Sequence, residues 1–332
     1  MERLIHADAN RDEIGIINDF TQFDAQIHHN CELADNTFSL IMPIGAWKAD
    51  KIMRGDYVYI DASEFGGIVS AVEKNTSEGT VTIKGPLWRA LLATRIIVPP
   101  SGAAYKVYSN TELNAMIADV IGNDYSGLFY VPSQSTGVTT SYQFRYQTKL
   151  FGLSKALLQA GHTLSCIYYA ETKRLAVQAR ACVDYSQYAD ISSDLGIGMT
   201  ISAGRIDDYN HCIALGTGEL EERMVRELWM LDGGISTTRP AALLEDDIRS
   251  MTFDYPNAES EEELLKSASE ALLEYAAMSS AQIDLQRAQL DLQLDDIIYT
   301  FDRDMNISAY KQVAQRVITI TQSGTTIETE VE

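Results

Sequence analysis

Apolar and polar positions alternate with a period of two through most of the first 85 residues. Phe38, Leu40 and Met42 fall on one face of the segment 36–43, and the segment 56–61 follows a turn glycine. Segments 68–73 and 80–84 flank a polar loop that contains Gly79, which predicts a hairpin. Five or more strands in fewer than 90 residues predict a β-barrel or β-sandwich.

The middle of the chain changes to helical spacing. Ser109–Glu112 fits a capping box ahead of a helix that Gly122 ends, and a second helix begins at Thr148 and ends at Gly161. The segment 139–146 is extended, and segments 163–169 and 174–181 predict a hairpin. Strand, helix and hairpin in this order favour an α+β unit over a parallel sheet.

The last third returns to strands, predicted at 199–205, 212–216, 224–231, 297–299, 313–321 and 325–331. The segment 232–259 is loop-like, and a helix begins at Ser260 and ends near residue 279. The fold class is therefore α+β, mostly antiparallel β, with two barrel- or sandwich-like units, an α/β insert and a C-terminal helix plus strands. The predicted domains are a β-barrel over 1–102 completed by strands from 199–232, an α/β domain over 103–198, and a helix-and-strand domain over 233–332.

Charge and cysteine usage narrow the class of function. The net charge of the 332 residues is −21, from 26 basic and 47 acidic side chains, which disfavours nucleic-acid binding and is compatible with a channel wall past which DNA slides. No run of 18 apolar residues predicts a membrane span, and the first residues lack the order of a signal peptide, so we expect synthesis in a cytoplasm. The four cysteines form no C-x-x-C pair and are expected to be free, buried thiols.

Several short motifs resemble the hub-like tail-tip proteins of long-tailed bacteriophages. A hairpin with "x-V-T-I-x-G" ends at Gly85, an arginine-flanked apolar segment follows, and "R-I-I-x-P-P" closes it at Pro100. "F-x-L-x-x-P" occurs at 38–43, "G-D-x-V-x-I" at 55–60, and a looser "N-x-x-x-x-G-x-G-x-x-x-x-R" at 210–223, one residue off the usual spacing. The family's "L-G-D-x-V" corresponds to 294–298, where Asp295 replaces the turn glycine; aspartate tolerates a positive φ less easily than glycine does.

The resemblance implies a virion structural protein at the tip of a phage or prophage tail. It implies a homo-oligomeric hub ring, most simply a trimer, that continues the tail tube and contacts a distal tail ring protein, a tape-measure protein or tail fibres. DNA would pass through the channel without specific binding. Trp88, Arg89 and Arg95 are the candidate assembly interface, and the alternative is that Trp88 packs inside its own barrel.

No catalytic, cofactor-binding or metal-binding residue is predicted. Ser154 imitates a hydrolase elbow but falls inside a capped helix, and the acidic runs 8–12 and 302–306 lack the glycine and closing glutamate of a calcium loop. Adjacent strand residues such as His28–His29 and His211–Cys212 point to opposite faces, and a structural role is expected for all five histidines. Gly216 and Gly218 fit a turn better than a phosphate-binding loop.

Two further classes of function stay open. A cell-wall-cleaving or carbohydrate-cleaving enzyme at the tail tip needs paired carboxylates near aromatic platforms, and the most obvious pair, Asp295–Asp296, has no tryptophan within ten residues. A module that binds a host receptor needs exposed aromatic loops, for which 125–130 and 185–188 are the candidates.

Overall fold

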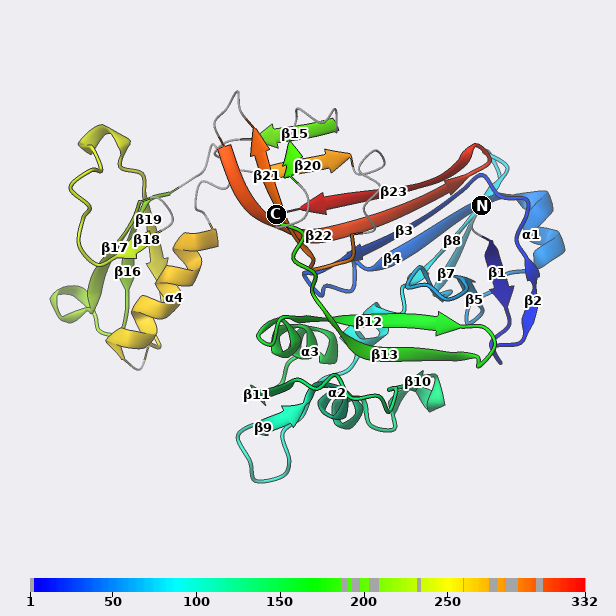
Figure 1. The fold of residues 1–332 in the computed structure, drawn as a ribbon, viewed down its shortest axis with the longest axis horizontal. Coiled ribbons are helices and arrows are strands. Elements are labelled where there is room, and N and C mark those ends of the chain that lie inside the picture. The colour runs from blue at the N-terminus through cyan, green and yellow to red at the C-terminus, as the bar shows by residue number, and fades with distance from the viewer. Residues whose placement is uncertain are drawn as a thin grey trace. The chain divides into compact units, whose positions relative to one another are not determined.

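The computed structural model describes residues 3–186, 190–192, 198–202, 209–231, 234–258, 260–274, 280–284, 292–302 and 307–331 (Figure 1). The chain divides into two compact units. Unit 1 comprises Met1–Thr200 and Ala281–Glu332, and unit 2 comprises Ile201–Ser280. Most strand pairs in both units are antiparallel and the helices are few, so the predicted α+β, mostly antiparallel class is confirmed.

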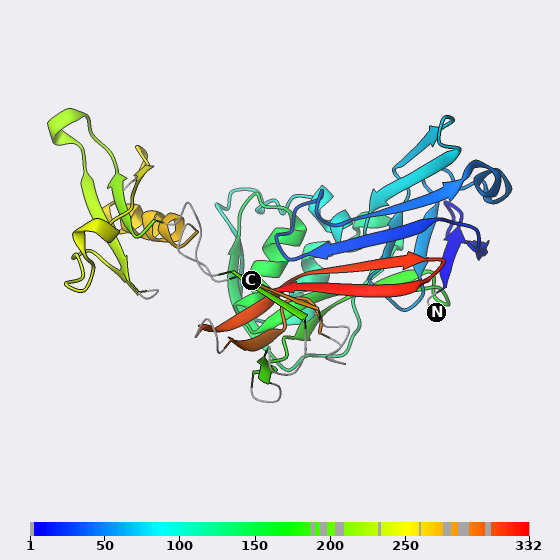
Figure 2. The same cartoon turned by 90° about the horizontal axis from the view of Figure 1, so that it is seen from above.

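Two sheets face each other in the N-terminal part of unit 1. The smaller has the order β2 (Glu13–Ile16), β1 (Leu4–Ala7), β5 (Tyr57–Ile60) and β6 (Gly66–Ile68). The larger sheet has the strand order β15 (Gly198–Ser202), β20 (Ser280–Asp284), β23 (Gly324–Val331), β22 (Ile307–Thr321), β3 (Gln22–His28), β4 (Thr37–Pro43), β8 (Thr80–Pro86) and β7 (Ala71–Asn75). In addition, β21 (Ile297–Asp302) pairs with both β22 and β14 (Asp190–Ser192). Figure 2 shows the red strands β22 and β23 beside the blue strand β3.

The core between these sheets follows from the predicted alternation. Phe38, Leu40 and Met42 of β4 are at most 2% exposed, and every second residue of β3 is buried in the same way. They pack with Val58 of β5 and with Ile318 of β22. Burial of each such side chain contributes about 1.5–3 kcal/mol, so the period-two pattern also fixes which face of each strand is inward.

The strand that pairs directly with β3 comes from the last part of the chain, and β15, at the start of the segment 199–232, lies at the far end of the same sheet. β22 pairs with β3 from Gln315↔His28 to Thr321↔Gln22, whereas β16 and β17, which lie in the segment 199–232, pair with each other in unit 2. A local pattern identifies a strand but not its partner, because pairing depends on contacts far along the chain. The sheet orders of the described residues are open, so the expected closed barrel is not found among them.

A helical layer completes unit 1. Helices α2 (Leu113–Ile121) and α3 (Lys149–Leu158) pack against the hairpin of β12 (His162–Tyr169) and β13 (Arg174–Ala181), as Figure 1 shows. The remaining elements are α1 (Ile44–Asp50), η1 (Arg89–Thr94), β9 (Lys106–Glu112), η2 (Asp124–Gly127), β10 (Phe129–Tyr130) and β11 (Thr139–Phe144).

The two predicted helix starts have different outcomes. Thr148 caps α3 as predicted, because its Oγ1 accepts a hydrogen bond from the Phe151 N–H at 3.2 Å. The predicted capping box at Ser109–Glu112 lies instead in β9. Glu112 itself caps α2 and accepts from the Ala115 N–H at 2.8 Å, so this prediction was wrong by three residues.

Unit 2 is a small sheet covered by one helix. Its order is β18 (Gly234–Ser236), β17 (Val225–Leu231), β16 (His211–Leu215) and β19 (Ser250–Asp254), with short turns η4 (Leu220–Glu222) and η5 (Glu245–Asp247). Helix α4 (Glu261–Glu274) buries Leu264, Ala268 and Leu272 against the sheet. The segment 232–259 holds two short strands where a loop was expected. Among the described residues no helix is long and apolar enough to cross a membrane.

Candidate functional site

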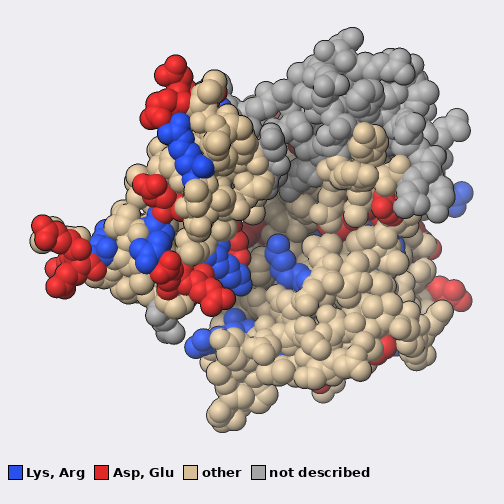
Figure 3. Space-filling model, turned by 60° about the vertical axis from the view of Figure 1, so that its left-hand side comes forward, with Lys and Arg blue, Asp and Glu red and all other residues tan. Residues whose placement is uncertain are grey.

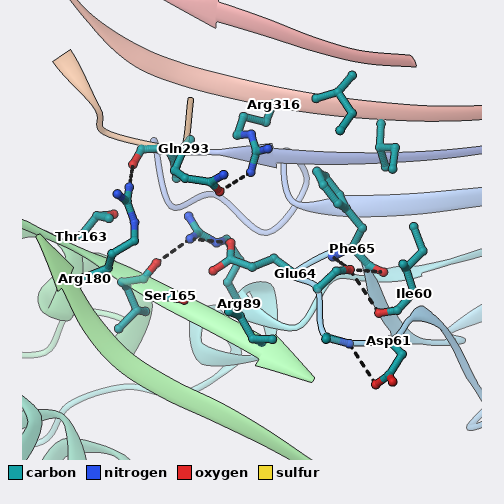
Figure 4. A pocket seen from close by; sticks show the side chains of 17 residues that line it. Ile60, Asp61, Glu64, Phe65, Arg89, Thr163, Ser165, Arg180, Gln293 and Arg316 are labelled. Carbon is teal, nitrogen blue, oxygen red and sulfur yellow. Dashed lines mark hydrogen bonds and ion pairs between the residues drawn. The ribbon is translucent and has the colours of Figure 1, made fainter. Parts of the chain in front are cut away.

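Unit 1 contains a cavity of about 530 Å³ with several charged and polar side chains in its lining. Three arginines from separate elements line it: Arg89 of η1, Arg180 of β13 and Arg316 of β22 (Figure 4). Phe65 and Ile318 supply an apolar wall. Buried guanidinium groups need acceptors, so the partners of these arginines decide what the site can do.

Arg89 is 4% exposed and is held by Glu64. Its Nη2 donates to Glu64 Oε2 at 3.1 Å and to the Leu164 carbonyl at 2.7 Å. Glu64 Oε1 accepts from the Cys166 N–H at 2.5 Å. Burial by itself lowers the pKa of Arg89, whereas the nearby Glu64 carboxylate raises it. The net result is a pKa above the ordinary value for arginine. Arg89 therefore stays protonated, and together with Glu64 it links η1 to β12.

Asp296 is the acceptor for Arg180. It is fully buried, and its Oδ1 accepts from Arg180 Nη1 and from the Val183 N–H, both at 2.9 Å. Its Oδ2 accepts from the Gln293 N–H at 2.8 Å. One carboxylate thus ties the end of β13 to the segment that leads into β21.

Asp295 makes the turn that the tail-tip resemblance assigns to glycine. Its φ is 66°, in the left-handed region, and its buried carboxylate accepts a hydrogen bond from Thr163 Oγ1. His29 Nδ1 lies 3.5 Å from Asp295 Oδ1. These contacts offset the cost of about 1–2 kcal/mol that a non-glycine residue has at this φ. The aspartate therefore replaces the glycine and adds a link between β12 and the end of β3.

The charged side chains around this cavity hold segments of unit 1 together. The carboxylates of Asp295 and Asp296 both accept hydrogen bonds from their own unit, so neither is an unengaged acid or base. Across the described ranges, no group of three His, Cys, Asp or Glu side chains is placed to hold a metal ion. Around the cavity, Arg89, Arg180 and Arg316 join distant segments by hydrogen bonds, and their acceptors are Glu64, Asp296 and the neutral amide of Gln293.

Of the three residues of the predicted assembly interface, two are buried and one is exposed. Trp88 has no exposed surface and stacks on Tyr168 with ring centroids 4.8 Å apart, and Arg89 is buried as described above. The alternative in which Trp88 packs inside its own unit is the one that the structure has, so neither residue is a surface anchor. Arg95 is exposed, and its guanidinium carbon lies 5.8 Å from the centre of the Tyr125 ring.

An exposed apolar groove includes Ile96, the residue that follows Arg95 in the chain. Leu33, Ile96, Tyr146 and Phe151 line it and are 45%, 48%, 64% and 40% exposed, around a volume of about 350 Å³. We call these four residues the Tyr146 groove. Its two central segments are fixed by backbone hydrogen bonds, from Ile97 N to Gln147 O at 2.8 Å and from Tyr146 N to Ile97 O at 3.1 Å.

A further exposed apolar side chain lies in unit 2. Leu220 is 94% exposed, has a φ of 51°, and lies in the turn Glu219–Glu222, which we call the acidic turn. Neither feature was predicted from the sequence. The groove joins residues more than 100 positions apart, so it has no local signal; a leucine between three glutamates was a signal that could have been noticed.

The other candidate motifs have local structural roles. Ser154 lies inside α3, as expected. The Asp8 carboxylate accepts from the N–H groups of Asn10 and Asp12 at 2.8 and 2.9 Å and so forms a turn, and these hydrogen bonds lower the pKa of Asp8. The His211 ring stacks on Trp229 at 3.8 Å. The acidic run 302–306 lies mostly outside the described residues.

The cysteines are free, as predicted. Cys31, Cys166 and Cys212 are buried and Cys182 is partly buried. Burial raises the pKa of the Cys166 thiol and raises the pKa of Cys182 to about 11. Such thiols are poor nucleophiles near neutral pH.

Solved structures share this architecture over almost the whole chain. The 43 kDa tail protein of prophage MuSo2 from Shewanella oneidensis aligns with a TM-score of 0.58 at 13% identity, covering 100% of this chain and 98% of that one. This chain has the fold of prophage tail proteins. The tail protein from Neisseria meningitidis MC58 aligns with a TM-score of 0.54 at 11% identity, covering 99% and 95% of the two chains. Prophage tail protein gp18 from Listeria monocytogenes EGD-e aligns with a TM-score of 0.52 at 12% identity, covering 99% and 94%.

These matches are ones of fold. No protein-family model and no curated protein matches the sequence. The resemblance to tail proteins that the motifs suggested is therefore confirmed by the shared tail-protein fold, at identities of 11–13%.

Proposed function

We propose that this protein is a structural component of a phage or prophage tail tip. In this proposal its copies form a hub ring, a homotrimer, that continues the tail tube and anchors distal tail proteins, and it has no enzymatic activity. The observation that carries the proposal is that the tail-protein fold extends over both units, not over one domain alone. Two β-rich units in each subunit let three copies present six β domains to a six-fold tube.

The charge of the chain supports a role as a channel wall. The net charge is −21, and Figure 3 shows acidic side chains gathered in several groups on one face, with basic side chains between them. Such a surface repels DNA within the Debye length, about 8 Å at physiological salt. DNA can then pass through the ring without specific binding. The partners in this proposal are further copies of the chain, a distal tail ring protein, and a tape-measure protein or tail fibres.

The two other candidate functions have less support. A cell-wall-cleaving enzyme would need its acid pair available, but Asp295 and Asp296 are buried and accept hydrogen bonds from their own unit. In the receptor-binding candidate 125–130, the Tyr125 hydroxyl donates to the Leu91 carbonyl at 3.1 Å and its ring packs on Phe129. The candidate 185–188 lies partly outside the described residues.

Quantitative mass spectrometry of tailed particles from the source organism tests the proposal. We expect about three copies of the chain per particle for a trimeric hub, whereas about six would assign it to a neighbouring six-fold ring. Absence of the chain from intact particles would contradict a structural role. Release of labelled fragments from cell walls by the pure protein would favour the enzyme instead.

A further inference from the structure

The Tyr146 groove has the composition of a protein-binding surface. Four large apolar side chains are each at least 40% exposed and lie together, whereas exposed apolar residues on monomers are usually scattered. Tyr146 also has a φ of 48°, in the left-handed region that a tyrosine rarely adopts. Aromatic residues held in such conformations are typical of sites whose shape is used for binding.

One basic side chain, Lys155, borders the groove. The Lys155 ammonium lies 5.6 Å from the centre of the Phe151 ring, and Lys155 is exposed. Arg95 and Arg145 are exposed as well, but their guanidinium carbons lie over the Tyr125 and Tyr105 rings, 5.8 and 5.5 Å from the ring centres, outside the groove lining. Glu32 is the single acidic residue that lines the groove within the described part of the chain. A partner for this surface should therefore combine an apolar side chain with a carboxylate that can pair with Lys155.

The acidic turn of unit 2 has this chemistry. Leu220 is the most exposed large apolar side chain of the described residues, at 94%, and Glu219, Glu221 and Glu222 around it are all exposed. The turn is tight, with hydrogen bonds from Glu222 N to Glu219 O at 3.0 Å and from Arg223 N to Leu220 O at 3.3 Å.

The base of the acidic turn is fixed as well. Arg223 Nε donates to the Gly216 carbonyl at 3.2 Å, and its Nη2 donates to Asp254 Oδ1 at 2.5 Å on β19. A Cβ atom on Gly218 would meet the Glu222 carbonyl oxygen at 2.5 Å, so this position requires glycine. The turn therefore presents one leucine and three carboxylates on a backbone that is already ordered, which lowers the entropic cost of docking.

We infer that the acidic turn of one copy docks into the Tyr146 groove of a neighbouring copy. Leu220 packs between Ile96, Tyr146 and Phe151, and a glutamate of the acidic turn pairs with Lys155. Because the two patches are different and lie on different units, the contact is heterologous, the type that generates a ring when the rotation closes. This inference rests on the proposed assembly of the chain into a ring, and it names one contact within an interface that must be larger, about 800 Å² per partner.

Site-directed cross-linking tests the contact between copies. Full-length chains carrying Leu220→Cys are mixed with differently tagged chains carrying Tyr146→Cys and oxidised, and the disulfide-linked product of mixed tags is quantified. The matched control replaces Tyr146→Cys by Ile14→Cys, since Ile14 is 58% exposed on β2 and lies outside the groove. Wild-type chains, with their four free cysteines, give the background.

We expect a mixed-tag product with Tyr146→Cys that exceeds the Ile14→Cys control about tenfold. An equal yield with the control, or none, overturns the docking contact. If the chain is nevertheless present in particles at about three copies, the ring proposal stands without this contact. Absence from particles defeats the ring proposal and, with it, this inference.

Substitutions in the acidic turn give an independent readout of the contact. Leu220→Asp and, separately, Glu221→Lys with Glu222→Lys should each raise the Kd of self-association about tenfold, while circular dichroism and the melting temperature stay unchanged because these side chains are exposed. Adding Lys155→Glu should restore association to the lysine variant. Unchanged association in Leu220→Asp, or failure of this rescue, contradicts the contact.

Discussion

Removal of the Asp296 carboxylate should destabilise unit 1 far more than removal of a surface acid. The Asp296→Ala variant leaves the backbone N–H groups of Val183 and Gln293 without their acceptor and removes one of the two acceptors of Arg180 Nη1, which also donates to the Ala181 carbonyl. Each unsatisfied buried donor costs about 1–3 kcal/mol, but the Arg180 side chain is 28% exposed and can reach water. Breaking a buried pair costs about 3–5 kcal/mol, and the lower end of this range applies here.

Urea unfolding followed by tryptophan fluorescence measures this loss. The chain has three tryptophans, and in a Trp229→Phe background the remaining two, Trp47 and Trp88, both report on unit 1. With an m-value of about 3 kcal/mol per molar, a loss of about 3 kcal/mol lowers the unfolding midpoint by about 1 M urea.

A surface pair in the same unit supplies the control. Glu73 pairs with Lys84 at 3.1 Å, and the two side chains are 64% and 49% exposed. Glu73→Ala should therefore cost less than about 0.5 kcal/mol. A free energy of unfolding for Asp296→Ala within about 1 kcal/mol of that of Glu73→Ala would refute the view that the buried carboxylate holds segments of unit 1 together.

Three further predictions test the packing, the thiols and the titration of unit 1. A Cβ on Gly67 would lie 1.9 Å from a backbone carbonyl oxygen, so Gly67→Ala should lower the free energy of unfolding by more than about 3 kcal/mol, whereas Gly15→Ala, with no atom within 4 Å, should change it by less than about 0.5 kcal/mol in the same urea assay. Cys166 is fully buried with a raised pKa, so a thiol reagent at pH 8 should modify it about 100-fold more slowly in native than in urea-unfolded protein, as peptide mass spectrometry can measure. The Tyr108 hydroxyl donates to Asp119 and lowers the pKa of that carboxyl; its stabilising effect is present above the unfolded pKa of about 3.9 and is lost as the pH falls, so Asp119→Asn should flatten the fall of the melting temperature between about pH 4 and 2.

The sequence predicted local elements well where one strong periodicity coincided with burial. The alternation of Phe38, Leu40 and Met42 predicted both the existence and the inward face of β4, and Thr148 predicted the start of α3. The short strands β18 and β19 were missed because each of these two strands has few apolar residues and lies among turn residues.

Long-range organisation could not be predicted in the same way. The pattern of β22 predicted a strand, but its pairing with β3, almost 300 positions earlier, has no local signature. Arg89 looked like a surface anchor because arginine is rarely buried; its burial depends on Glu64, 25 positions before it. The Tyr146 groove likewise unites segments near residues 33, 96, 146 and 151, which only the folded chain brings together.

The pairing of β22 with β3 also sets the order in which the subunit can mature. During synthesis β3 and β4 leave the ribosome early, but the neighbour that covers β3 and supplies Ile318 and Ile320 to the core comes from the last part of the chain. Unit 2 has all its strands within 201–280 and can fold before that point. A nascent chain interrupted before β22 keeps an unpaired strand edge and an open core, features that chaperones and proteases recognise. Unit 1 therefore closes its core only when β22 has been made.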